Sequence, residues 1–273
     1  MKKGNSSEKI VLITGASSGI GKSVASYLSQ RNFKVYGTSR SVKNSAEAGF
    51  EFVQLDVTSE DSIKAAIASI ISKEQKIDIL INNAGVGITG PIEETPESEM
   101  RKAFDTNYFG PLNLIKHVLP HMRKQHSGLI INITSIAGYM GLPYRGIYSA
   151  TKGALGVTTE AYRMEVKQFG IKMTNVAPGD FATNIAAGRY HAPVVNGSPY
   201  EEVYGRTLDI MNEHVDAGQD PELMAKEIFR IIHEEEPNVH YKVGERLQKI
   251  SVKLKALLPD KLYEKMLLKH YKL

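Results

Sequence analysis

Tyr148 and Lys152, four residues apart in the segment YSATK, have the types and spacing needed for proton chemistry. On a helix this spacing places both side chains on one face, roughly 6 Å apart along the axis. A tyrosine with an ordinary pKa near ~10 is a poor proton-transfer partner at neutral pH, and a nearby ammonium lowers that pKa by stabilising the phenolate. For an isolated Y-x-x-x-K the commoner arrangement is a packed tyrosine beside a lysine that reaches water. The surrounding sequence must therefore decide between a proton-transfer pair and ordinary packing.

Short apolar runs alternate with longer segments of helical periodicity, and these elements must position the pair. Strands are predicted at residues 9–14, 33–38, 50–55, 76–82, 128–134, 171–176 and, as a short seventh, 240–243. Helices are predicted at 19–31, 42–48, 59–73, 96–125 and 145–169. Such alternation is typical of a parallel sheet covered on both faces. We predict one α/β domain over residues 1–244, a Rossmann-type doubly wound sheet of about seven strands that binds ligands beyond the carboxyl ends of its strands.

A glycine-rich segment, TGASSGIG, follows the first strand and opens the next helix. Gly15, Gly19 and Gly21 have the spacing G-x-x-x-G-x-G, which differs from the G-x-G-x-x-G dinucleotide fingerprint but works by the same physics. Glycines let backbone amides approach a pyrophosphate, and the helix N-terminus adds free N–H donors and a favourable dipole. The segment therefore predicts a dinucleotide site.

The second strand indicates which dinucleotide is bound. Sites for NAD usually place an acidic residue about 20 residues after the glycines, on the ribose 2′-hydroxyl. No Asp or Glu occurs from Lys9 through Ala46, and the strand ends at Ser39-Arg40. A guanidinium offers a planar fork of donors suited to a phosphate. We therefore expect NADP(H) rather than NAD.

Polar residues also follow the next strands. Asp56, after the third strand, is placed either to accept a hydrogen bond from an adenine amino group or only to support the next turn. Asn83 and Gly85, in the segment NNAG after the fourth strand, suit a backbone that lies against the ribose or adenine. Ser135 ends the fifth strand thirteen residues before Tyr148, and Asn107 lies in the long predicted helix 96–125.

TGASSGIG, NNAG, Asn107, Ser135, YSATK and PGDFAT occur in this order, and the chain resembles the short-chain dehydrogenase/reductase family over about residues 9–183. The resemblance implies a catalytic set in which Tyr148 exchanges a proton with the substrate oxygen and Ser135 binds that oxygen. It also implies that Lys152 holds the nicotinamide ribose and favours the tyrosinate, while Asn107 holds a water that links Lys152 to solvent.

The same resemblance implies a set of cofactor contacts. They are Gly15, Ser17, Ser18, Gly19, Ile20, Gly21, Ser39, Arg40, Asp56, Val57, Asn83, Ala84, Gly85, Tyr148, Lys152, Pro178, Gly179, Phe181 and Thr183. In this set the Thr183 hydroxyl is expected to contact the nicotinamide carboxamide. No metal ligand is predicted.

Two further segments bear on the substrate. Residues 184–219 are rich in Gly, Pro and Tyr and resemble the family's substrate lid; Tyr139, Met140, Leu142, Tyr190, Tyr200, Tyr204 and Met211 suggest a mostly apolar pocket. Residues 245–273 form a basic extension with eight Lys or Arg against three Asp or Glu and with two runs of helical apolar spacing separated by Pro259. An extension of this kind resembles longer members that act on steroids, retinoids and other lipophilic alcohols and ketones, and it counts against a 3-oxoacyl carrier-protein reductase.

Composition limits the other classes. The chain has 273 residues, no cysteine and a net charge of +4, and no apolar run approaches transmembrane length. We expect a cytoplasmic protein with a small-molecule substrate and without nucleic-acid partners. The basic faces of the extension leave contact with a membrane surface as an alternative to packing on the domain, which we favour. The resemblance implies a homodimer or homotetramer.

The sequence thus predicts an NADP(H)-dependent oxidoreductase that transfers a hydride between the nicotinamide and a carbonyl or secondary alcohol of a lipophilic substrate. Two other classes stay open. A non-catalytic NADP-binding sensor or scaffold would normally lose part of the Ser-Tyr-Lys set, which is complete here. An epimerase or dehydratase of the extended branch usually has a different glycine spacing and a larger C-terminal region.

Overall fold

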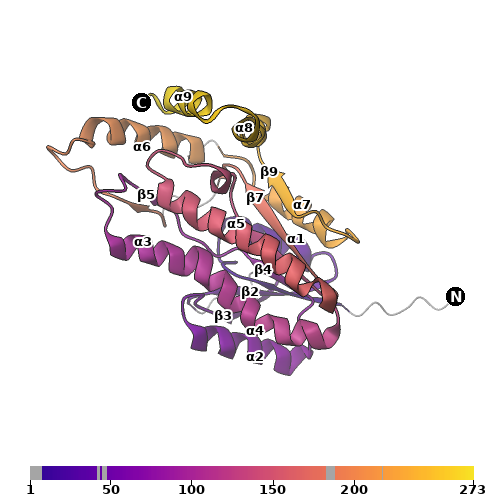
Figure 1. The fold of residues 1–273 in the computed structure, drawn as a ribbon. Helices are drawn as coiled ribbons and strands as arrows, with labels where there is room; N and C mark the ends of the chain where they lie inside the picture. The colour runs from indigo at the N-terminus through magenta and orange to yellow at the C-terminus, as the bar shows by residue number, and fades with distance from the viewer. Residues whose placement is uncertain (1–7, 42–43, 45–47, 183–187, 217) are drawn as a thin grey trace.

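The computed structural model describes residues 8–41, 44, 48–182, 188–216 and 218–273. A seven-stranded parallel sheet with the strand order β3-β2-β1-β4-β6-β7-β9 forms its centre, as the sequence predicts (Figure 1). The strands of this sheet are β1 (Lys9–Ile13), β2 (Phe33–Ser39), β3 (Glu51–Gln54), β4 (Ile79–Asn82), β6 (Gly128–Ile133), β7 (Ile171–Pro178) and β9 (His240–Val243). A separate parallel pair joins β5 (Ile88–Thr89) to β8 (Tyr190–His191).

Helices cover both faces of the sheet. They are α1 (Gly19–Ser29), α2 (Glu60–Glu74), α3 (Glu97–Phe104), α4 (Gly110–Gln125), α5 (Gly146–Val166), α6 (Glu201–Asp216), α7 (Glu222–Ile232), α8 (Arg246–Leu257) and α9 (Asp260–Tyr271). Successive residues of a strand point to opposite faces of the sheet, so the apolar run of β1 contributes side chains to two cores, one on each face. Val11 and Ile13 pack with α1 and α7, whereas Ile10 and Leu12 pack with α2 and α4.

The predicted helix 96–125 is interrupted by a π-helical turn, Asp105–Phe109, between α3 and α4. Gly110 N–H donates to the carbonyl of Asp105, five residues back. Pro111 lacks an N–H and cannot donate to the carbonyl of Asn107, as a continuous α-helix would require. The proline therefore favours the wider turn, which is a form of helix often found at functional sites.

Other predicted elements also differ from the structure. The predicted helix 42–48 falls largely outside the described residues. Helix α7 is not among the predicted elements, and α6 lies within the segment predicted only as a lid. The two apolar runs of the extension are helices α8 and α9, which lie with α6 at one end of the molecule (Figure 1). Within the described ranges no helix is both long and apolar enough to cross a membrane.

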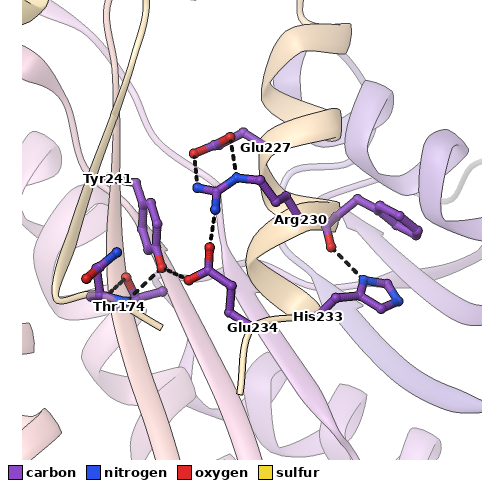
Figure 2. A network of polar contacts seen from close by, with 8 residues as sticks. Thr174, Glu227, Arg230, His233, Glu234 and Tyr241 are labelled. Carbon is purple, nitrogen blue, oxygen red and sulfur yellow. Dashed lines mark hydrogen bonds and ion pairs between the residues drawn. The ribbon is translucent and has the colours of Figure 1, made fainter. Parts of the chain in front are cut away.

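A polar network fixes the strand from which the extension departs (Figure 2). Arg230 of α7 forms an ion pair with Glu234, and Glu234 accepts a hydrogen bond from the Tyr241 hydroxyl of β9. The Tyr241 oxygen also accepts from Asn238 N–H at 2.7 Å, while Thr174 Oγ1 of β7 donates to the Asn238 carbonyl at 2.7 Å. These contacts hold α7, β7 and β9 together at the base of the extension.

Candidate active site

The loop before α1 has the geometry of a phosphate cradle. Gly15 and Gly19 have φ values of +68° and +55°, a conformation that favours glycine. A Cβ on Gly21 would lie 2.3 Å from the carbonyl oxygen of Gly15, so the loop folds tightly against the helix. Ser17 and Ser18 are exposed, the N-cap residue Ser18 makes no side-chain cap, and the first turn of α1 has no acidic residue. The free N–H groups of this turn suit a pyrophosphate.

The loops that follow β1 and β4 are joined by hydrogen bonds. Thr14 Oγ1 accepts from the N–H groups of Asn83 and Ala84, both at 2.9 Å. Asn83 Nδ2 donates in return to the carbonyls of Thr14 at 2.9 Å and Gly15 at 3.2 Å. Asn83 therefore sets the position of the glycine loop through its side chain, and Thr14 is a contributor that the sequence motifs did not single out.

The predicted adenine-side residues lie at the ends of β2 and β3. Arg40 is exposed directly after Ser39, the last residue of β2. Asp56 Oδ1 accepts from Thr58 N–H at 2.9 Å and from Thr58 Oγ1 at 2.7 Å, and the backbone hydrogen bond is the main cause that lowers the pKa of Asp56. Of the two alternatives for Asp56, these contacts favour support of its own turn. Val57 is buried in the core beside α4.

Asn107 is wholly buried on the π-helical turn, and its side chain positions two other elements. Its Oδ1 accepts from Val86 N–H at 2.8 Å. Its Nδ2 donates to the Val86 carbonyl at 2.9 Å and to Thr151 Oγ1 at 3.1 Å. Asn107 thereby joins the loop after β4 to the helix that carries Tyr148 and Lys152.

Lys152 is buried beneath Tyr148 on α5. Its Nζ donates to the carbonyl of Ile133 at 2.9 Å, and burial lowers its pKa to about 8. A Cβ on Gly85 would lie 3.3 Å from this Nζ and 3.1 Å from Asn107 Oδ1, so only a glycine leaves the space between them open. The structure thus brings Gly85, Asn107 and Lys152 together.

Helix α5 is fixed to the sheet by buried side chains. Asn82 Nδ2 of β4 donates to Asn132 Oδ1 of β6 at 2.8 Å, and Asn132 Nδ2 donates to Thr159 Oγ1 of α5 at 2.8 Å. Asn175 Nδ2 of β7 donates to the carbonyl of Gly156 at 3.0 Å. Buried polar contacts of this kind set the register of one element on another. They fix the height of Tyr148 and Lys152 above the strand ends.

Ser135 and Tyr148 line one cavity of about 550 Å³. Ser135 Oγ accepts from Ala137 N–H at 3.1 Å, which leaves its hydroxyl hydrogen available to a substrate. Ile20, Pro178, Gly179 and Phe181, all predicted cofactor residues, line the same cavity. Thr183 lies outside the described residues. The cavity therefore contains both the proposed nicotinamide side and the proposed substrate side.

Most of the remaining cavity wall is apolar, and the C-terminal extension supplies much of it. Met140, Leu142 and Met211 line the cavity as predicted, together with Leu247, Leu254 and Met266 of α8 and α9. The four predicted tyrosines are placed elsewhere. The Tyr204 hydroxyl donates to the Ala192 carbonyl at 2.9 Å and that of Tyr200 donates to Glu93 at 2.7 Å; Tyr139 and Tyr190 do not line the cavity either.

Sequence patterns did not identify four polar residues that line this cavity, namely Arg145, Arg189, Gln248 and Tyr271. Gln248 Nε2 donates to Asp180 Oδ2 at 2.7 Å, and its Oε1 accepts from Asp180 N–H at 3.3 Å. Arg189, Gln248 and Tyr271 are distant from the motifs along the chain and reach the cavity only through the tertiary fold. Arg145 lies three residues before Tyr148, so its position in the sequence alone would have placed it near the cavity.

Comparisons with known proteins agree with this arrangement. Residues 9–193 match the family model for short chain dehydrogenases. A 3-ketodihydrosphingosine reductase from Bacteroides thetaiotaomicron is 41% identical over 94% of this chain and 95% of its own length. Retinol dehydrogenase 8 from Bos taurus is 30% identical over 92% of this chain and 86% of its own length.

Solved structures give the same result. A short-chain dehydrogenase from Streptomyces avermitilis superposes with a TM-score of 0.76 at 30% identity and covers 94% of this chain and 99% of its own. ElxO with NADP bound has a TM-score of 0.70 at 29% identity over 86% of this chain and 97% of its own. With the glycine loop, the Ser-Tyr-Lys set and the sheet order already established, the chain belongs to the short-chain dehydrogenase/reductase family of nicotinamide-dependent oxidoreductases that act on CH–OH groups.

Proposed function

We propose that the protein is an NADPH-dependent reductase of a ketone on a long-chain lipophilic substrate. The observation that carries this proposal is the shared cavity, in which Ser135 and Tyr148 meet an apolar wall supplied by α8 and α9. A cavity of about 550 Å³ is within the range of small-molecule sites and has room for part of an alkyl chain. The similarity to a 3-ketodihydrosphingosine reductase supports the same substrate class.

In this proposal Ser135, Tyr148 and Lys152 have different roles in the protonation of the substrate oxygen. The Ser135 hydroxyl donates a hydrogen bond to the carbonyl oxygen, and the Tyr148 hydroxyl transfers its proton to that oxygen. The hydride that reaches the carbonyl carbon comes from bound NADPH, so C=O becomes CH–OH. Lys152, with a pKa of about 8, is mainly an ammonium at pH 7 and stabilises the tyrosinate that remains. Its N–H groups not donated to Ile133 are available to ribose hydroxyls.

Tyr148→Phe removes the proton donor and tests this mechanism. We expect kcat to fall about 10²- to 10⁴-fold in NADPH oxidation with the best substrate of a panel of long-chain ketones, because general acid catalysis contributes this much, while NADPH binding stays unchanged. Tyr162→Phe is the matched control, because Tyr162 lies on the same helix but is partly buried against the core beside α2 and α4 and does not line the cavity. Full activity in Tyr148→Phe would refute the assigned role. Tight NADPH binding without turnover of any ketone would favour a cofactor sensor.

The preference for NADPH rests on Arg40. Arg40 is exposed after β2, and no ion pair within the described residues involves its guanidinium. We expect Arg40→Asp to weaken NADPH binding about 10- to 100-fold, because hydrogen bonds from the guanidinium to the charged phosphate are lost. NADH binding should be nearly unchanged. Fluorescence titration of both cofactors measures the ratio, with Arg40→Lys as the charge-preserving control. An unchanged ratio would exclude Arg40 and point to Lys22, the basic residue directly after Gly21 of the glycine-rich segment.

A further inference from the structure

Two arginines face the cavity beside Tyr148. Arg145 immediately precedes α5, and its guanidinium carbon lies 5.4 Å from the centre of the Tyr148 ring. Arg189 immediately precedes β8, whose pairing with β5 brings it against the loop after β4. A Cβ on Gly87 would lie 2.8 Å from Arg189 Cγ, which places this side chain directly over that loop. Both arginines line the cavity.

Neither guanidinium has a carboxylate partner in the ranges that the structure describes. Arg189 Nη1 is buried and makes no hydrogen bond there. Burial first, and the charge of Arg145 second, hold the pKa of Arg189 below its usual value. Asp180 and Glu245 line the same cavity, but neither forms an ion pair with Arg145 or Arg189 in the described ranges, and Asp180 Oδ2 already accepts from Gln248 Nε2. Two like charges in one cavity, one with a buried donor unused, are unfavourable without a further partner.

We propose that Arg145 and Arg189 form an oxyanion-binding subsite, so that the substrate carries a carboxylate, phosphate or sulfonate close to its ketone. The proposal rests on the proposed reductase function and specifies its substrate class. Arg145 contacts the ring of Tyr148, so the anionic group lies only a few bonds from the carbonyl. The alkyl chain then extends toward Leu254 and Met266 of the extension. Arginine suits this task because its fork of donors matches an oxyanion.

The position of the pair separates it from the proposed phosphate cradle. The cradle lies at the N-terminus of α1, whereas Arg145 and Arg189 lie beside Tyr148 and Gly87. The pair also disfavours a cationic group. The substrate is therefore expected to differ in head-group charge from 3-ketodihydrosphingosine, whose amine is positively charged at neutral pH.

The test uses the full-length enzyme and three long-chain ketones. They are 2-oxotridecylphosphonate, its uncharged dimethyl ester and 3-ketodihydrosphingosine. We expect kcat/KM for the phosphonate to exceed that for the ester by about 10- to 100-fold, as for a charge-assisted pair. Arg189→Gln should abolish this preference, so that the ratio of kcat/KM for the phosphonate to kcat/KM for the ester falls to about one. Arg246→Gln, at the exposed start of α8, is the control for loss of one basic residue.

Calorimetry with NADP⁺ already bound gives a second readout, because no ketone is reduced in that complex. If the phosphonate binds more tightly than the ester and Arg189→Gln removes this difference, the subsite is supported. This holds even if neither ketone is turned over, because absence of turnover would refute only the proposed function. If the phosphonate and the ester bind with equal affinity, or if 3-ketodihydrosphingosine binds most tightly of the three ketones, the subsite is overturned and the proposed reductase function is unaffected. A weaker NADPH affinity in Arg189→Gln with the phosphonate preference retained assigns the arginine to the cofactor and also overturns the proposal.

Discussion

Lys152 shows how burial changes the chemistry of a single residue. The side chain is 5% exposed, and burial lowers its pKa from 10.5 to about 8. Between these two pH values the unfolded chain binds a proton at this position and the folded chain does not. Stability therefore rises with pH across this window and is flat below it. The Lys152 ammonium, which the proposed mechanism uses at neutral pH, is thus maintained at a cost in folding stability.

Lys152→Met should remove this pH dependence. We expect the free energy of unfolding of the unmodified protein to rise by about 3 kcal/mol between pH 8 and pH 10.5 relative to that of the variant, at 1.36 kcal/mol per pKa unit. Urea denaturation at several pH values measures the difference between the two proteins. Lys253→Met, an exposed change in α8, is the control and should follow the unmodified protein. Parallel curves for Lys152→Met would show that the lysine is not perturbed in the folded state.

At the scale of the elements, α8 is joined to the loop that follows β7. Gln248 contacts both the backbone N–H and the carboxylate of Asp180. A Cβ on Gly179 would lie 1.9 Å from Gln248 Oε1, so the glutamine occupies the space that this glycine leaves open. The loop expected to hold the nicotinamide is therefore positioned by the extension and not by the sheet alone.

Gln248→Ala should loosen this junction. Because Asp180 N–H loses its partner, we expect a loss of about 1 to 3 kcal/mol in unfolding free energy. Hydrogen exchange should accelerate at residues 178–181 and 246–257, where the contact is made, and remain unchanged in β1 and β4. Lys253→Ala, whose side chain is exposed on the same helix, should change stability by less than about 0.5 kcal/mol. Unchanged exchange at residues 178–181 would mean that the loop holds its position without α8.

The elements also show how far the sequence could predict the site. Tyr148 and Lys152 are four residues apart on one helix, so local periodicity was enough to pair them. Strand-end motifs placed Ser135 correctly because parallel strands end at one edge of the sheet. Helix α7 was missed although Met224, Ile228 and Ile232 recur at helical spacing. Arg189 and Gln248 could not be predicted, because each reaches the cavity only through a pairing between β5 and β8 or between α8 and Asp180, distant along the chain.

For the molecule as a whole, the extension completes the cavity and adds little to the central sheet. Val252 of α8 and Tyr263 of α9 form a separate cluster with Ile136, Met140 and Ala177. This cluster lies apart from the two large cores on the faces of the sheet. The sheet and the glycine loop therefore have cores of their own, while the substrate side depends on α8 and α9.

Removal of residues 245–273 should separate cofactor binding from recognition of the substrate chain. In the complete protein each added methylene should lower KM about fourfold while the chain still contacts the wall, at about 0.8 kcal/mol per buried CH₂. We expect this dependence to flatten in the shortened protein, measured with 2-alkanones of increasing length, while NADPH still binds at the glycine loop but more weakly, because the contact of Gln248 with Asp180 is lost. Leu254→Ala, which only trims the wall, should give an intermediate slope. A slope that survives removal of both helices would place the alkyl chain elsewhere.

The π-helical turn makes the position of Asn107 depend on the number of residues in the chain as well as on their identity. Each residue advances an α-helix by about 100°, so an extra residue in one turn rotates everything after it relative to everything before it. Deletion of Thr106 would remove one residue from this turn while Asn107, Ser135, Tyr148 and Lys152 kept their identity. The contacts of Asn107 with Val86 and Thr151 depend on that rotation. Alignments and engineered variants of this enzyme must therefore conserve length here as strictly as they conserve residue type.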